Sequence, residues 1–137
     1  MVGEKDKIIK QLEKDFSFLK DKVLAVLLFG SLAQENYCGR SDIDICIVAP
    51  DGDPQKILKE VFRNVDVHGK NYDVKIFEEL PLYLKIQVIN SHEVIFGDKQ
   101  DLYEYFYKFR KIWKDQEHRQ KVSKEELLRI LKGNSNL

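Results

Sequence analysis

The order of apolar and polar residues changes period several times along the chain, which predicts an alternation of helices and strands. Residues 5–22 repeat an apolar side chain every three or four positions, as one face of an amphipathic helix does. Residues 23–29, VLAVLLF, are continuously apolar and precede a glycine, which predicts a strand buried on both faces. Residues 42–48, DIDICIV, alternate polar and apolar positions, so Asp42 and Asp44 are expected to share one face of a second strand.

The rest of the pattern predicts two further strands separated by helices. Strands are expected at 72–77, YDVKIF, and, in shorter form with a turn, at 92–98, HEVIFGD. Further helices are expected at 31–37 (a helical turn), 55–64, 79–90, 102–114 and, as a separate short helix, 123–133. The expected buried stripe of the 55–64 helix is Ile57, Leu58, Val61 and Phe62. The expected apolar side of the 102–114 helix is Leu102, Phe106, Phe109 and Trp113.

These elements predict the α/β (α+β) class, with a small mixed sheet of three or four strands flanked by helices. A single domain is expected over residues 1–137, with a core at about 23–97 and a C-terminal helical region at about 100–132. A chain of 137 residues with 43% hydrophobic content can bury a sufficient core without disulfides or metals as staples.

Composition narrows the classes of function. Lysine plus arginine equals aspartate plus glutamate at 23 each, whereas proteins that bind extended nucleic acid usually carry a basic excess. No apolar run approaches the roughly 18–20 residues that cross a bilayer, and the charged N-terminus is not typical of a signal peptide. We therefore expect a soluble, cytoplasmic protein without a membrane segment. Cys38 and Cys46 form no CxxC motif, and the three histidines are scattered, so no zinc site is expected.

Two acids inside an apolar strand require a physical reason, because like charges this close repel each other. On one strand face, Asp42 and Asp44 would lie about 6–7 Å apart at the backbone, and each would tend to hold a proton. A divalent cation reverses that interaction, and oxygen-only ligands suit Mg²⁺. Asp73 lies near the start of the next predicted strand. If that strand neighbours the second strand, three carboxylates converge, and three acids can hold two metal ions about 3.5–4 Å apart, the arrangement used for displacement at phosphorus.

Gly30 and Ser31 supply a second candidate feature, at the point where the first predicted strand ends. Backbone N–H groups at a strand-to-helix junction form an anion site, and glycine allows a phosphate to approach closely. The Ser31 hydroxyl can donate a further hydrogen bond. The stretch is neither a Walker A loop nor a dinucleotide GxGxxG motif.

Ten residues separate Gly30-Ser31 from Asp42-Ile43-Asp44, and a strand aspartate, Asp73, follows. This GSx10DxD pattern between two hydrophobic runs resembles the DNA polymerase β-like nucleotidyltransferase superfamily. The layout around DIDICIV, YDVKIFEELP and VIFGD looks most like the minimal nucleotidyltransferases, over about residues 23–97. These are prokaryotic single-domain proteins, often paired with a HEPN-domain protein as antitoxin and toxin.

The resemblance implies an enzyme that moves AMP, or another nucleoside monophosphate, from an NTP such as ATP to a hydroxyl and releases pyrophosphate. It implies that Asp42 and Asp44 bind two Mg²⁺ ions, and that Asp73 binds the catalytic ion and is a candidate general base. Gly30 and Ser31 would hold the triphosphate. The implied acceptor is a tyrosine of a HEPN toxin partner, in a type VII-like toxin–antitoxin pair.

The stretch after Gly30 departs from the family pattern. Many relatives have a basic GSRARG-like helix there, whereas this chain has GSLAQEN, which removes positive charge where the triphosphate would lie. Arg40, as a nucleotide-binding residue, and Lys75 are the candidates to supply that charge.

Other functions stay open on the sequence alone. A binding-only antitoxin with weak or no catalysis would also suit the missing basic residues, and a small-molecule (antibiotic) nucleotidyltransferase is an alternative enzyme. The aromatic residues of the helix at 102–114 exceed what one buried stripe needs. This excess predicts a contact with a partner or a second copy, because tyrosine and tryptophan are enriched at interfaces.

Overall fold

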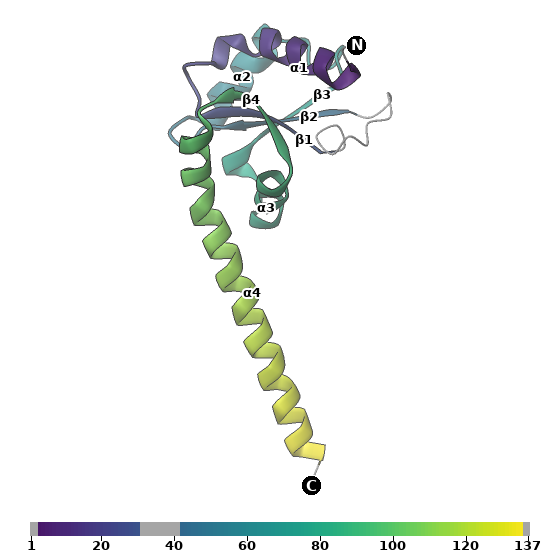
Figure 1. The fold of residues 1–137 in the computed structure, drawn as a ribbon, viewed down its shortest axis with the longest axis vertical. Helices are drawn as coiled ribbons and strands as arrows, with labels where there is room; N and C mark the ends of the chain where they lie inside the picture. The colour runs from purple at the N-terminus through teal and green to yellow at the C-terminus, as the bar shows by residue number, and fades with distance from the viewer. Residues whose placement is uncertain (1–2, 31–41, 136–137) are drawn as a thin grey trace.

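A computed structural model describes residues 3–30 and 42–135 of the chain, and Figure 1 shows the arrangement of its elements. The elements follow one another as α1 (Glu4–Asp15), a 3-10 turn (Ser17–Leu19), β1 (Ala25–Phe29), β2 (Ile43–Val48), α2 (Pro54–Asn64), β3 (Tyr72–Ile76), a second 3-10 turn (Phe77–Glu79), α3 (Leu82–Asn90), β4 (His92–Gly97) and α4 (Lys99–Ser135).

The four strands form one mixed sheet in the order β3-β2-β1-β4. β1 pairs antiparallel with both of its neighbours, and β2 pairs parallel with β3. The prediction of a small mixed sheet flanked by helices is therefore confirmed. The prediction for β1 is confirmed too, because its first four residues are buried and their side chains alternate between two hydrophobic cores.

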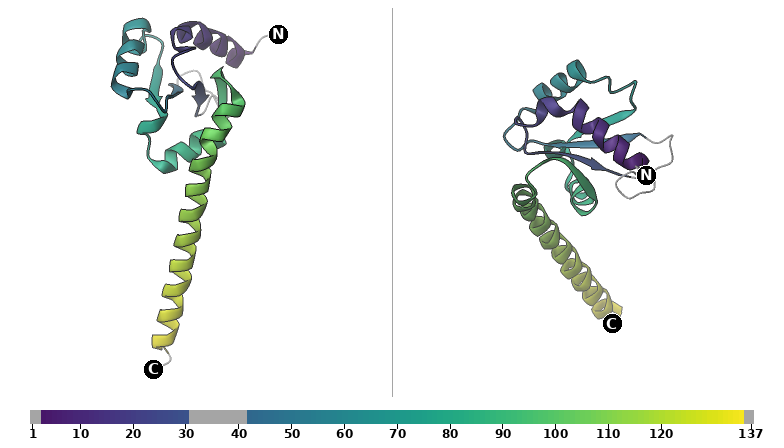
Figure 2. Two further views of the ribbon diagram at one scale, coloured as in Figure 1. Left: turned by 90° about the vertical axis from the view of Figure 1, so that its left-hand side faces the viewer. Right: turned by 45° about the horizontal axis from the view of Figure 1, so that its top comes forward.

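Helices cover both faces of the sheet. α1 and α2 lie over one face, where Leu12 and Val61 pack against the isoleucines of β2. α3 and the first turns of α4 lie over the other face, where Ile89 and Phe106 pack with Cys46, whose thiol is buried and free. Figure 2 shows the same layers from two further directions, with the rest of α4 extending away from the sheet.

Two predicted helix boundaries are wrong, for local reasons. The first helix ends at Asp15 rather than continuing to 22, because Phe16 leaves the helical conformation, with φ −104° and ψ 12°, and is buried in the core. α3 begins at Leu82 rather than 79, because Pro81 disfavours a helical conformation in the residue before it.

Two further corrections concern exposure and continuity. Phe62 is not part of the buried stripe of α2, since 58% of its surface is exposed, whereas Val61 is fully buried. The helices expected at 102–114 and 123–133 form one helix, α4. The residues between them, DQEHRQKV, include no glycine or proline and mostly favour helix. Within the described residues, no helix combines the length and the apolar character that crossing a membrane requires.

Candidate active site

Asp44 and Asp73 lie side by side on adjacent strands. In the parallel register of β2 and β3, Asp44 is paired with Asp73 at the Cα positions. Neighbouring strands are about 4.8 Å apart, and paired residues direct their side chains to the same face. The third predicted strand therefore does neighbour the second, and it brings these two acids together on the face that α3 and α4 cover.

Asp42 lies immediately before β2 and is exposed to solvent. It precedes Asp44 by two residues, the spacing that places successive side chains on one strand face. Burial raises the pKa of Asp44 above 3.8, and the negative charges of Asp73 and Asp42 raise it further. Lys75 acts in the opposite direction, and its Nζ lies 3.7 Å from Oδ1 of Asp73. The three acids thus form a site of concentrated negative charge.

Gly30 directly follows β1 and lies next to this charge. Its φ of +77° lies in the left-handed region that favours glycine, and a Cβ added there would lie 3.1 Å from Cγ of Asp44 and overlap the carboxylate. The proximity follows from the sheet, because Phe29 of β1 is paired with Asp44. Gly30 therefore makes room for an acid of the site, a role that the sequence pattern did not reveal.

The other predicted nucleotide-binding residues, Ser31 and Arg40, lie outside the described residues, as does the helical turn expected at 31–37. The candidate site residues that the structure describes are Gly30, Asp42, Asp44 and Asp73. Lys75 belongs with them by its contact with Asp73.

The donor chemistry of this site fits a hard divalent cation. Carboxylate oxygens are the ligands that Mg²⁺ takes from proteins, and it completes its coordination with water and substrate phosphates. Within residues 3–30 and 42–135, no group of three or more acidic, histidine or cysteine side chains is close enough together to hold a metal ion. The paired acids Asp44 and Asp73, whose charges repel, are the residues best suited to share one.

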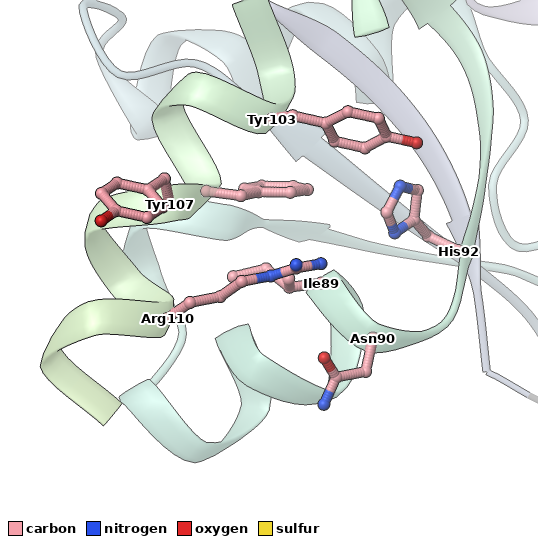
Figure 3. Close-up of a pocket in the computed structure, with 7 residues that line it drawn as sticks. Ile89, Asn90, His92, Tyr103, Tyr107 and Arg110 are labelled. Atoms are coloured by element: carbon pink, nitrogen blue, oxygen red, sulfur yellow. The ribbon is translucent and has the colours of Figure 1, made fainter. Parts of the chain in front are cut away.

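A separate hollow lies between α3 and α4 and has a volume of about 570 Å³. Figure 3 shows Tyr103, Tyr107 and Arg110 of α4 along one side and His92 of β4 opposite them. The predicted excess of aromatic residues on this helix divides into two groups. Tyr103 and Tyr107 are 51% and 66% exposed, whereas Tyr105 is tied to the domain by a 2.8 Å hydrogen bond from its hydroxyl to Glu78.

Sequence comparison links the chain to enzymes that transfer nucleotides. The family model for "Polymerase beta, Nucleotidyltransferase" matches residues 6–101. "Putative protein adenylyltransferase MJ1547" of Methanocaldococcus jannaschii is 52% identical over 98 residues, which cover 72% of this chain and 75% of that protein. "Putative protein adenylyltransferase MJ0141" of the same organism is 36% identical over 70 residues, 50% of this chain and 71% of that protein.

Solved structures share the fold. A chain of a toxin–antitoxin complex with AMP-PNP has a TM-score of 0.65 and 21% identity, covering 92% of this chain and 99% of that chain. A chain from a complex of a tri-AMPylated Shewanella oneidensis HEPN toxin with an MNT antitoxin has a TM-score of 0.58 and 20% identity, covering 90% and 95%. At such identities the likeness concerns the fold alone. Because the family model matches well over half of this chain, the chain belongs to the polymerase beta nucleotidyltransferase family, as the spacing of Gly30-Ser31 and Asp42-Ile43-Asp44 predicted.

Proposed function

We propose that this chain is an Mg²⁺-dependent protein adenylyltransferase that moves AMP from ATP to a tyrosine hydroxyl of a HEPN-domain toxin, and so acts as the antitoxin. The observation that carries the proposal is the pairing of Asp44 with Asp73 on adjacent strands, next to Gly30. The relatives named as protein adenylyltransferases support AMP as the transferred group. The complex of an MNT antitoxin with a tri-AMPylated HEPN toxin supports the kind of acceptor.

The proposed reaction is a displacement at the α-phosphorus of ATP. The acceptor oxygen forms a bond to that phosphorus, the bond from phosphorus to the α–β bridging oxygen breaks, and pyrophosphate leaves. The tyrosine hydroxyl loses its proton, and Asp73 is the candidate that accepts it, because its side chain is accessible at 42% exposure. A phenol has a pKa of about 10, so this proton requires a base beside it.

Asp44 and Asp73 are proposed to share Mg²⁺, with Asp42, just before the strand of Asp44, as the proposed third ligand. The chemistry that the ion supplies when bound is neutralisation of the phosphate oxygens and a lower pKa for the attacking hydroxyl. The chain supplies the anchoring: Asp44 is fixed on a central strand of the sheet, and Asp73 is fixed beside it. Gly30, Ser31 and Arg40 are proposed to bind the triphosphate, Gly30 and Ser31 through backbone N–H groups and the serine hydroxyl.

The proposal is tested by incubating the chain with labelled ATP, Mg²⁺ and a candidate HEPN-domain partner. We expect label on a tyrosine of the partner and loss of toxicity. The double variant Asp42→Asn/Asp44→Asn is expected to lower labelling by at least about a hundredfold, because it removes two of the charges proposed to hold the metal ion.

The matched control is Asp51→Asn/Asp53→Asn, another pair of acids two residues apart, in the turn before α2. It is expected to leave labelling intact. If the Asp42/Asp44 variant still neutralises the toxin without labelling it, the proposed enzymatic function is wrong and a binding-only antitoxin is favoured. Label on an antibiotic but not on protein would favour a small-molecule enzyme.

A further inference from the structure

α4 carries most of the exposed apolar surface of the described residues. Of the ten large hydrophobic side chains that are exposed, eight belong to this helix: Tyr103, Tyr107, Ile112, Val122, Leu127, Leu128, Ile130 and Leu131. Beyond Trp113, every side chain that is described, up to Lys132, is exposed. Helices in proteins take most of their stability from packing of an apolar face. This part of α4 therefore has the properties of an interaction element.

The exposed leucines continue the face by which α4 packs on the domain. Leu127, Leu128 and Leu131 follow Leu102, Tyr103 and Phe106 by 25 residues each, which is about seven turns at 3.6 residues per turn. Leu102 and Phe106 are buried against the sheet and α3. The apolar face thus runs on past the end of the domain, along the side where α3 ends.

The hollow of about 570 Å³ lies at the near end of this face. Tyr103 and Tyr107 stand at its edge, and Arg110 projects across it in Figure 3. Between Tyr103 and Leu131 the helix spans 28 residues, or about 42 Å at 1.5 Å per residue. We name this surface the α4 face; it runs from Tyr103, Tyr107 and Arg110 at one end to Leu127, Leu128 and Leu131 at the other. Its aromatic, arginine and leucine side chains give it the composition of a protein interface.

The charge of the helix segment that carries the α4 face indicates what covers it. From Arg110 to Lys132 the helix has eight lysine and arginine residues against four aspartate and glutamate residues, although the whole chain is neutral. Two copies packed through this segment would bring like net charges together, which is unfavourable. A partner with an acidic surface around an apolar centre would meet complementary charge.

We propose that the α4 face is the docking surface for the partner protein, which contacts it with an acidic face that has apolar residues at its centre. The partner is the HEPN-domain protein of the proposed function, and the inference rests on that proposal for its identity. The residues of the α4 face differ from the acids of the candidate site, so docking and nucleotide transfer can be tested by separate substitutions.

The test compares two substitutions on the same helix. Leu131→Glu places an acid on the α4 face, where the leucine is 54% exposed. Val122→Glu places the same charge at a residue that is 46% exposed and lies nine residues, or about two and a half turns, away on the opposite side. Binding to the HEPN-domain protein is measured by calorimetry without ATP, at low and high salt.

We expect Leu131→Glu to weaken binding at least about tenfold, Val122→Glu to leave it within about threefold, and added salt to weaken the wild-type complex. The free chain is expected to sediment as a monomer. Equal binding by Leu131→Glu and the wild type, failure of the wild type to bind, or a dimer of the free chain that Leu131→Glu dissociates would each overturn the inference. Labelling with ATP is measured separately, so an intact complex without label would count against the proposed function and not against the docking surface.

Discussion

At the scale of single residues, the Asp44 carboxylate has room because Gly30, directly after the neighbouring strand β1, has no side chain. Gly30 has φ +77°, and any side chain there would overlap the carboxylate. The same glycine is a candidate for phosphate binding through its backbone. One residue can thus serve two ends of the site, since it borders both the acid and the start of the segment predicted to bind the triphosphate.

Gly30→Ala is expected to reduce AMP transfer at least about tenfold, because the methyl group forces the Asp44 side chain to move. It should also cost about 1–2 kcal/mol of stability, because an L-residue is strained at this φ. Gly97→Ala is the matched control: its φ is +130°, a Cβ would lie 2.7 Å from the Leu24 carbonyl oxygen, and it pairs with Ala25 at the other end of β1. Transfer is measured at a temperature where both variants stay folded. Equal loss of transfer in the two variants would mean that strain alone, and not the position of Asp44, explains the effect.

The sequence predicted the candidate acids, and the structure adds the strand register in which two of them are paired. Asp42, Asp44 and Asp73 could be identified from alternation and spacing, because a carboxylate within an apolar strand is unusual. The pairing of Asp44 with Asp73 depends on β2 and β3 being parallel neighbours in one register, which is a tertiary property. The role of Gly30 in clearing Asp44 depends in the same way on the pairing of Phe29 with Asp44.

At the scale of elements, Asp15 joins the end of α1 to the start of β3. Its carboxylate accepts hydrogen bonds from Nζ of Lys70 at 2.8 Å, the hydroxyl of Tyr72 at 2.6 Å and Nε2 of Gln11 at 3.0 Å. Burial by itself raises the pKa of Asp15, but these hydrogen bonds and the charge of Lys70 outweigh it, and the pKa lies below 3.8. The ionised carboxylate therefore stabilises the fold.

Asp15→Asn is expected to lower the free energy of unfolding by about 1–3 kcal/mol at pH 7, because it removes the charge that these donors contact. A carboxyl whose folded-state pKa is lowered stabilises above the unfolded value, here 3.8, and the stabilisation disappears as the pH falls through the folded-state pKa. The difference in unfolding free energy between the wild type and the variant should accordingly become smaller below about pH 4. Urea unfolding across pH 3–7 measures it, with the exposed Glu13→Gln on the same helix as the control. A difference in unfolding free energy that stayed constant with pH would show that the charge of Asp15 is not the source of the stability.

The elements also show where periodicity is a sufficient guide and where it is not. The stripe of Leu102, Phe106, Phe109 and Trp113 was predicted from spacing and packs as expected. The same spacing could not indicate that the helix continues to Ser135, because helix formers without a break support either one helix or two. Phe62 follows Leu58 by four residues, which is the spacing of one helix face, but on α2 it is exposed to solvent.

At the scale of the whole molecule, one face of α4 is buried at its start and exposed to solvent further along the helix. Near its start the face is covered by the domain, and seven turns later it is bare. Burial in the sheet layers supplies the stability of the domain, whereas the distal leucines contribute little to it in the free chain. The molecule therefore combines a stable nucleotidyltransferase fold with a helix whose apolar face can be used for binding.

Two substitutions of the same kind separate these environments. Leu102→Ala removes a fully buried side chain and is expected to cost about 2–5 kcal/mol of unfolding free energy, because it leaves a cavity beside Phe106. Leu127→Ala lies 25 residues further along the same face, is 55% exposed, and should change that free energy by less than about 0.5 kcal/mol. Urea unfolding of the isolated chain, followed by fluorescence of Trp113, measures both. A large loss for Leu127→Ala in the isolated chain would mean that the distal helix is already packed against something, which its exposure in this structure contradicts.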